Sequence, residues 1–143
     1  MPRSLRSLVR PQLKGSIVGQ TEGDLVRDLA PTIKRQRLLL EGYYSIAMDR
    51  EAVRRYLTQV AAHLGLRTYA EPVIHSPSGE GKHENQGFDA FIPLIDSGIS
   101  LYVWSEQHFF SALLYTCKAF DEQAAVSFTR RFFASEEVVH SSF

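Results

Sequence analysis

Three strand-like segments follow one another with almost no chain between them. In chain order they are residues 88–95 ("FDAFIPLI"), 98–106 ("GISLYVWSE") and 109–117 ("FFSALLYTC"). In the middle segment Ile99, Leu101 and Val103 fall on one face, with the two-residue period of a strand that buries one side. Connections of two or three residues can join only antiparallel strands, because parallel strands need a crossover of a dozen or more. The sequence therefore predicts an antiparallel hairpin series at the centre of the fold.

Two amphipathic segments predict helices. Asp49 is a good N-cap for a helix over 50–64, and Gly65 stands where a C-terminal cap belongs. Asp121 is expected to cap a second helix over about 122–134. Further strands are predicted at 37–44, 66–74 and 136–140, with a polar, glycine-rich loop at 75–87. Segregated strands and helices of this kind predict an α+β fold, a two-layer sandwich of a mainly antiparallel sheet with helices on one face.

The composition points to an intracellular protein with a single folded domain. A chain of 143 residues with 44% hydrophobic side chains is long enough to bury a core. The single cysteine excludes an internal disulfide and fits a reducing cytoplasm. No apolar run approaches the roughly 18–20 residues that cross a bilayer, and the Arg-rich start lacks the apolar segment of a signal peptide. We therefore expect a cytoplasmic protein without a membrane anchor.

A net charge of zero conceals two oppositely charged parts. Residues 1–37 carry eight Lys and Arg against three Asp and Glu, a net charge of +5 that leaves −5 for the remainder. We interpret 1–36 as a basic N-terminal extension and 37–143 as the folded domain. Nucleic acid is an unlikely partner, because the extension lacks interleaved aromatic residues for stacking on bases. The alternative is a solvated extension that docks on its own acidic domain or on a neighbouring subunit.

Few residue patterns in the chain indicate a reactive site. The five histidines show no metal-binding spacing, and no phosphate-binding glycine loop occurs, so no metal ligand is predicted. Ser97 and Cys117 lie about equally far from a turn centred near residues 106 and 107. A hairpin with that turn would set a hydroxyl and a thiol across from each other at one sheet edge. Lone buried cysteines are more often inert, which is the simpler interpretation of Cys117.

The stretch from Asp96 to Cys117 resembles the bacterial S-adenosylmethionine decarboxylase family. Family members carry a run of the form E-S-H-[IL]-[ST]-I-H-T-W-P-E and a cysteine at the end of the next strand. Here residues 96–106 read D-S-G-I-S-L-Y-V-W-S-E, and the interval from Ser97 to Cys117 matches without a gap. A weaker similarity covers about residues 37–143. The resemblance implies a homodimer whose sheets pair into a four-layer αββα sandwich.

The resemblance also implies a chemistry. Ser97 would be the precursor of a pyruvoyl cofactor, formed when its hydroxyl attacks the carbonyl of Asp96, an ester forms by an N-to-O shift, and β-elimination cleaves the chain. The pyruvoyl group would form a Schiff base with the amine of S-adenosylmethionine during decarboxylation, in the biosynthesis of the polyamine spermidine. Cys117 would reprotonate the product carbon, and Glu106 would hold the ribose hydroxyls of the substrate.

Several positions depart from the family pattern and keep two alternatives open. Tyr102 falls where the family has its processing histidine, Gly98 replaces another histidine, and Asp89 falls near a second processing serine. Gly42 stands in the place of a phenylalanine that stacks on adenine. One alternative is a pyruvoyl enzyme for a different amino acid, such as arginine or ornithine. The other is an unprocessed, non-catalytic homologue that binds a ligand or regulates a partner subunit.

Overall fold

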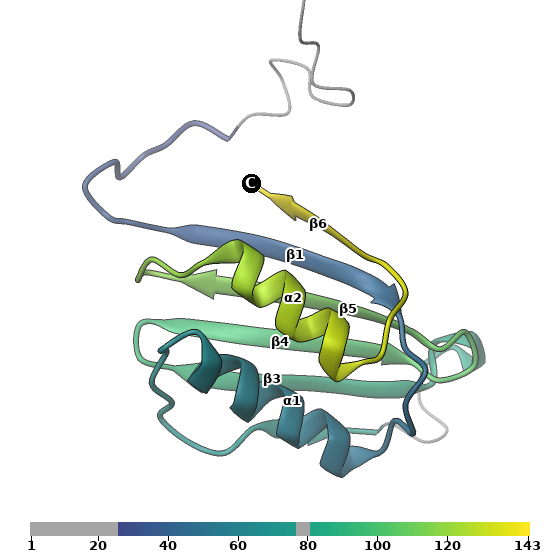
Figure 1. Ribbon diagram of the computed structural model, residues 1–143. Coiled ribbons are helices and arrows are strands. Elements are labelled where there is room, and N and C mark those ends of the chain that lie inside the picture. The colour runs from purple at the N-terminus through teal and green to yellow at the C-terminus, as the bar shows by residue number, and fades with distance from the viewer. Residues whose placement is uncertain (1–25, 77–80) are drawn as a thin grey trace, which may run out of the picture. The chain divides into compact units, whose positions relative to one another are not determined.

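The described residues form one antiparallel sheet, two α-helices and a short 3-10 helix. The computed structural model describes residues 26–76 and 81–143, of which Thr32–Phe143 form a compact unit. The elements are β1 (Gln36–Tyr43), α1 (Arg50–His63), β2 (Val73–His75), the 3-10 helix η2 (His83–Asn85), β3 (Gly87–Leu94), β4 (Ser97–Trp104), β5 (Phe109–Thr116), α2 (Glu122–Phe132) and β6 (Val138–Ser142). The six strands run in the order β2-β3-β4-β5-β1-β6, and every neighbouring pair is antiparallel (Figure 1). The predicted α+β fold is confirmed.

The central hairpins form where the short connections require them. Leu94 pairs with Ser97 across a turn of two residues, and Trp104 pairs with Phe109 across a turn of four. Both turns contain a residue with a left-handed backbone, Asp96 with φ 56° and His108 with φ 53°. The hairpins thus confirm the predicted antiparallel series.

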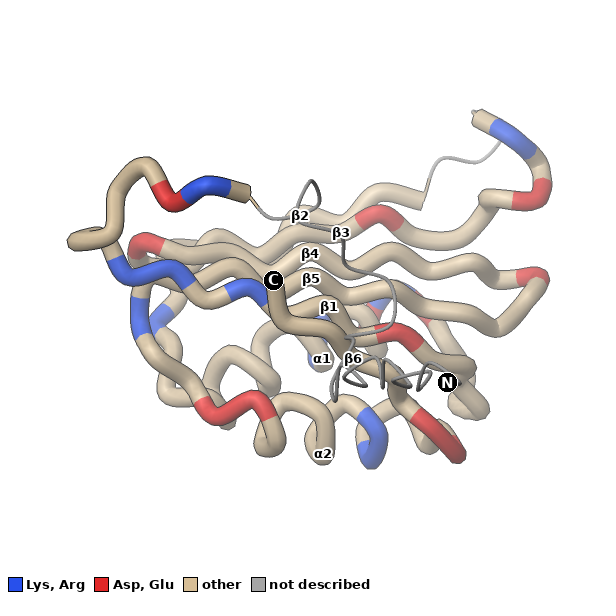
Figure 2. Tube along the Cα trace, turned by 90° about the horizontal axis from the view of Figure 1, so that it is seen from above, with Lys and Arg blue, Asp and Glu red and all other residues tan. Residues whose placement is uncertain are grey.

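Both helices lie on the same side of the sheet, which Figure 2 shows in edge view. Alternate strand residues on that side, among them Leu40, Ile99 and Leu114, are fully buried beneath the helices. Each helix begins where an aspartate caps it. The side chain of Asp49 accepts a hydrogen bond from the backbone N–H of Ala52, and Asp121 accepts one from Ala124.

A buried polar contact joins the two helices. The phenol of Tyr56 in α1 lies 2.9 Å from the hydroxyl of Thr129 in α2, and both side chains are fully buried. The Tyr56 ring also packs on Phe133, with ring centroids 4.5 Å apart. Burial raises the pKa of Tyr56 well above the usual value for a phenol. This contact sets the spacing of α1 and α2 over the sheet.

The structure corrects two sequence predictions. The strand predicted at 66–74 is confined to Val73–His75, preceded by an isolated bridge between Thr68 and Leu94. Pro72 lacks a backbone N–H, so it cannot extend the ladder toward the helix. The last strand lies at 138–142 rather than 136–140. Of the predicted extension, residues 1–25 lie outside the described part of the chain, and residues 26–35 contain neither helix nor strand.

The side of the sheet that the helices leave uncovered is here called the open face. Its residues alternate with the buried ones and include several large apolar side chains: Leu39, Phe91, Tyr102, Leu113 and Tyr115. Phe91 is 44% exposed, which is high for a side chain at the middle of a strand. Apolar surface of this kind marks an interaction site when it is contiguous.

Candidate functional site

Ser97 and Cys117 come together at one end of the β4–β5 hairpin. Ser97 is the first residue of β4 and pairs with Thr116, so Cys117 lies one residue beyond the end of β5. The backbone N–H of Cys117 donates a hydrogen bond of 3.2 Å to Oγ of Ser97. Both residues are only partly buried. The Ser97 oxygen is therefore fixed by the neighbouring strand while its own O–H remains able to donate.

The peptide bond that precedes Ser97 belongs to a strained turn. Asp96 has φ 56°, in the left-handed region, and it is exposed. Aspartate tolerates this conformation better than most residues, yet an L-residue there costs about 1–2 kcal/mol relative to glycine. The strained residue, Asp96, is therefore the one whose carbonyl carbon forms the peptide bond with the Ser97 nitrogen.

A pocket of about 390 Å³ adjoins this turn on the open face. It is lined by Phe91, Asp96, Ser97, Gly98, Ser100, Leu113 and Tyr115. A Cβ atom at Gly98 would lie 2.5 Å from the ring of Phe91, so the glycine allows that ring to lie close to the turn. Ser97 therefore borders a cavity with mainly apolar walls.

The other two predicted site residues lie elsewhere in the chain. Tyr102 is five residues further along β4, between its cross-strand partners Asp89 and Ser111. It lines a separate pocket of about 250 Å³ together with Asp89 and Lys82. Glu106 belongs to the turn after Trp104. The strand rise of about 3.3 Å per residue places the two ends of β4 roughly 23 Å apart, so one chain does not bring Glu106 to Ser97.

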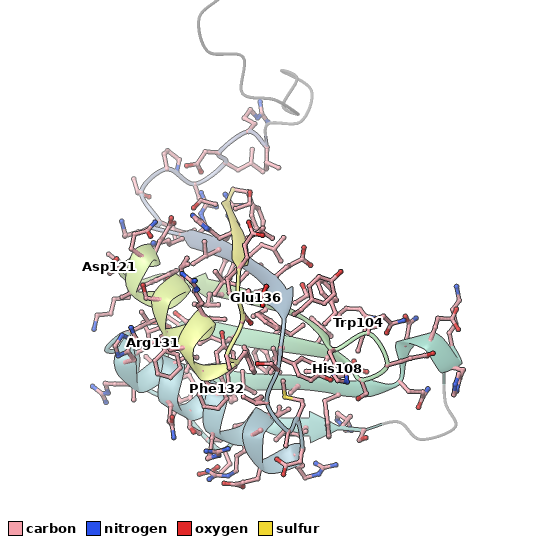
Figure 3. All side chains as sticks on the ribbon, turned by 45° about the vertical axis from the view of Figure 1, so that its right-hand side comes forward. Trp104, His108, Asp121, Arg131, Phe132 and Glu136 are labelled. Carbon is pink, nitrogen blue, oxygen red and sulfur yellow. The ribbon has the colours of Figure 1, made fainter. Side chains whose placement is uncertain are left out.

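Three aromatic rings form a row that the sequence analysis did not identify. Tyr43, Phe109 and Trp104 are paired in register across β1, β5 and β4, at the end of the sheet opposite Ser97. Ring centroids are 5.7 Å apart for Tyr43 and Phe109 and 5.2 Å apart for Phe109 and Trp104. Figure 3 shows Trp104 at that end of the sheet, with His108 of the β4–β5 turn nearby. The row depends on the pairing of β1 with β5, for which the sequence holds no local signal.

The described residues contain neither a metal-binding cluster nor a membrane-spanning helix. Within residues 26–76 and 81–143, no three His, Cys, Asp or Glu side chains gather closely enough to hold a metal ion. In the same part of the chain, no helix has the length and apolar character needed to span a membrane.

Comparison with known protein families identifies the class to which this chain belongs. The sequence model of the S-adenosylmethionine decarboxylase family matches residues 36–143, which contain the whole sheet and both helices. The chain therefore belongs to the S-adenosylmethionine decarboxylase family.

Among solved structures, the chain is similar to the adenosylmethionine decarboxylase from Aquifex aeolicus VF5. The TM-score is 0.62 at 17% sequence identity, over 78% of this chain and 89% of that one. At this identity the likeness supports the fold alone. No curated protein sequence matches the chain significantly.

Proposed function

We propose that this chain is a pyruvoyl-dependent decarboxylase that generates its cofactor from Ser97 and acts on S-adenosylmethionine in spermidine biosynthesis in the cytoplasm. The observation that carries the proposal is the hydrogen bond from the Cys117 amide to Ser97 Oγ, directly after the strained Asp96. This arrangement lies inside the region matched by the family.

The residues around Ser97 fit the formation of such a group. Ser97 Oγ attacks the carbonyl carbon of Asp96, and an ester forms as the peptide C–N bond breaks. Elimination then removes the α-proton of residue 97 and expels the Asp96 carboxylate, and water replaces the nitrogen, which leaves as ammonia. A pyruvoyl group at position 97 would supply a carbonyl for the amine of the substrate and would take up electrons as CO2 departs.

Cys117 is the proposed proton donor to the product carbon. The backbone N–H of Cys117 is hydrogen-bonded to Ser97 Oγ, and Cys117 directly follows Thr116, the residue that pairs with Ser97. The thiol therefore belongs to a residue whose backbone contacts Ser97. A thiol can serve as a general acid in this way, provided that it is kept reduced. The end of β5 therefore both fixes the Ser97 oxygen and carries the acid.

Glu106 can act on the same substrate only if a second copy of the chain supplies it. Within one chain it lies at the opposite end of β4 from Ser97. Pairing of two open faces in opposite strand directions would bring Glu106 of one copy toward Ser97 of the other. Exposed apolar side chains such as Phe91 and Tyr115 support an interface on that face. We therefore propose a homodimer in which two sheets form the inner layers of an αββα sandwich.

One observation favours the unprocessed alternative. The two cross-strand partners of Tyr102 are Asp89 and Ser111, so no imidazole stands directly beside the position of the processing histidine. A phenol is a poor base at neutral pH. In that case the chain would bind a ligand or regulate a partner subunit without cleaving itself.

Another observation favours a different amino-acid substrate. A Cβ atom at Gly42 would lie 2.9 Å from the backbone oxygen of Glu137 and 3.1 Å from the ring of Phe110. No aromatic ring fits at residue 42 without moving these atoms. An adenine ring would therefore need another stacking partner, whereas arginine or ornithine would need none.

Intact-mass spectrometry of the purified full chain tests the proposal. Cleavage predicts two fragments, residues 1–96 and 97–143, with a carbonyl in place of the amine on the second. The Ser97→Ala variant must remain a single chain. A wild-type chain that stays whole after prolonged incubation would reject the enzyme and leave the unprocessed alternative.

The substrate is tested on the cleaved protein. Release of labelled CO2 is measured from S-adenosylmethionine, arginine and ornithine, each labelled in the carboxyl group. Release from S-adenosylmethionine alone supports the main proposal. Release from arginine or ornithine alone identifies the alternative substrate class, and the Cys117→Ala variant should lower the rate with either.

A further inference from the structure

The open face of the sheet is mainly apolar, but β1 carries one cation and one anion on it. Arg37 and Glu41 both project from this face, with Leu39 between them, and both are half-buried. In Figure 2 the strand has one blue and one red position. Four residues of strand span about 13 Å, and side chains stand roughly perpendicular to a sheet. The two charges therefore do not meet within one chain.

Neither charge has an ionic partner among the described residues. The Nε atom of Arg37 is shielded from solvent and has no hydrogen-bond acceptor there. The guanidinium carbon lies 5.3 Å from the centroid of the Phe143 ring, which attracts the cation but does not neutralise it. Within the same part of the chain, no hydrogen bond or ion pair engages the carboxylate of Glu41. A single chain therefore leaves both groups able to take a partner of opposite charge.

A second copy of the chain on the open face would bury both charges. An interface that leaves a charge unpaired, or sets like charges against each other, is strongly penalised, whereas one that joins opposite charges is not. Arg37 and Glu41 can therefore decide how two copies pair. For two sheets packed face to face in a symmetric dimer, the two-fold axis runs either along the strands or across them.

An axis along the strands brings like charges together. Glu41, Ser111, Tyr102 and Asp89 form one row across β1, β5, β4 and β3. Rotation about an axis between β4 and β5, the middle of the sheet, places β1 of one copy over β3 of the other and leaves this row at the same height along the strands. Glu41 would then face Asp89 of the second copy, and the two carboxylates would repel each other.

An axis across the strands brings opposite charges together. Each strand then lies over its own counterpart in the reverse direction. The middle of β1 falls between Leu39 and Leu40, with Arg37 on one side and Glu41 on the other. Arg37 is therefore offset from Glu41 of the second copy by only about one residue, or roughly 3.3 Å along the strand. Facing sheets are about 10 Å apart, a gap that an arginine and a glutamate side chain span together.

We propose that Arg37 of each copy forms an ion pair with Glu41 of the other, and that these two reciprocal ion pairs select the reversed pairing of the open faces. The inference rests on the homodimer proposed above and adds the residues that set its geometry. The same reversal brings Glu106 of one copy toward Ser97 of the other. The ion pairs on β1 would therefore also hold the shared site on β4 in place.

Charge reversal tests the ion pairs in the uncleavable Ser97→Ala full chain, whose dimer dissociation constant is measured by sedimentation equilibrium. Arg37→Glu or Glu41→Arg replaces two attractive contacts by two repulsive ones, so each should weaken the dimer at least about 100-fold. The double variant Arg37→Glu/Glu41→Arg should regain most of the affinity. Arg131→Glu makes the same charge change at an exposed position of α2, on the helix side of the sheet, and should alter the constant less than about twofold.

Mixing the two single variants separates a pairing defect from a folding defect. The Arg37→Glu chain has two acidic groups on β1 and the Glu41→Arg chain has two basic ones, so the mixture should form a heterodimer although each variant alone dimerises weakly. A variant that had failed to fold could not pair on mixing. Reversals that leave the dimer unchanged, or variants that stay apart when mixed, would overturn the ion pairs and leave the homodimer standing. A Ser97→Ala chain that stays monomeric would overturn both, while self-cleavage of the wild type is judged separately by intact mass.

Discussion

The left-handed turn at Asp96 leads to a prediction that links stability to self-cleavage. The φ angle of 56° costs an L-residue about 1–2 kcal/mol, whereas glycine adopts it freely. Glycine loses more freedom on folding, which offsets about 0.5–1 kcal/mol of the gain. Asp96 is exposed, so its replacement removes no packing. Asp96→Gly should therefore raise the free energy of unfolding by about 0.5–1 kcal/mol.

The same substitution should slow cleavage of the bond between residues 96 and 97. In the proposed self-cleavage, the attack of Ser97 Oγ would open the strained peptide unit, so strain released in the transition state would lower the barrier. Removing about 1 kcal/mol of that strain should reduce the rate about fivefold. Urea denaturation of the uncleavable Ser97→Ala form gives the stability, and the time course of intact mass gives the cleavage rate.

Ala134 provides the matched control. Its φ of 48° is also left-handed, but it lies in the connection after α2. Ala134→Gly should stabilise the fold by a similar amount and leave the cleavage rate unchanged. If Asp96→Gly and Ala134→Gly have the same effect on cleavage, the strain at residue 96 plays no part in it. A loss of stability in Asp96→Gly would refute the strain itself.

Three other variants test the fold. Gly42→Ala should cost about 1–3 kcal/mol in urea unfolding because the new Cβ meets the backbone oxygen of Glu137; an unchanged midpoint would contradict that contact. Tyr56→Phe should cost about 1 kcal/mol by leaving the buried Thr129 hydroxyl without its partner, and adding Thr129→Val should recover part of the loss. Burial raises the pKa of Tyr44 above its usual value near 10, so the folded state holds the phenol proton more tightly than the unfolded chain. The stability that Tyr44 contributes is full below pH 10 and is lost as the pH rises through the pKa of the folded state. In Tyr44→Phe the free energy of unfolding should fall less steeply with pH in that range. An unchanged slope would contradict the raised pKa.

Local signals explain why much of the fold was predictable from sequence. The turns between β3, β4 and β5 are too short for anything but hairpins, and capping aspartates mark the start of both helices. The approach of Ser97 to Cys117 follows from the same local geometry, because both residues are nearly equidistant from one turn.

Long-range pairing explains what the sequence did not predict. Nothing local indicates that β1 lies between β5 and β6, so the row of Tyr43, Phe109 and Trp104 could not be recognised. The family pattern places Glu106 in the same site as Ser97, but a pattern along the chain does not say which copy of the chain supplies a residue. The strand predicted at 66–74 was too long because Pro72, which has no backbone N–H, interrupts the ladder, so that only Val73–His75 pair with β3.

The strand order determines what a cut at residue 96 would do to the molecule. The first fragment would contain β1, α1, β2 and β3, and the second would contain β4, β5, α2 and β6. β1 lies between β5 and β6, and β3 is paired with β4 along eight residue pairs. The two fragments are thus interlocked, and they can separate only if β1 is pulled out from between two partners. A nicked chain would behave as one particle under native conditions and as two polypeptides only after denaturation.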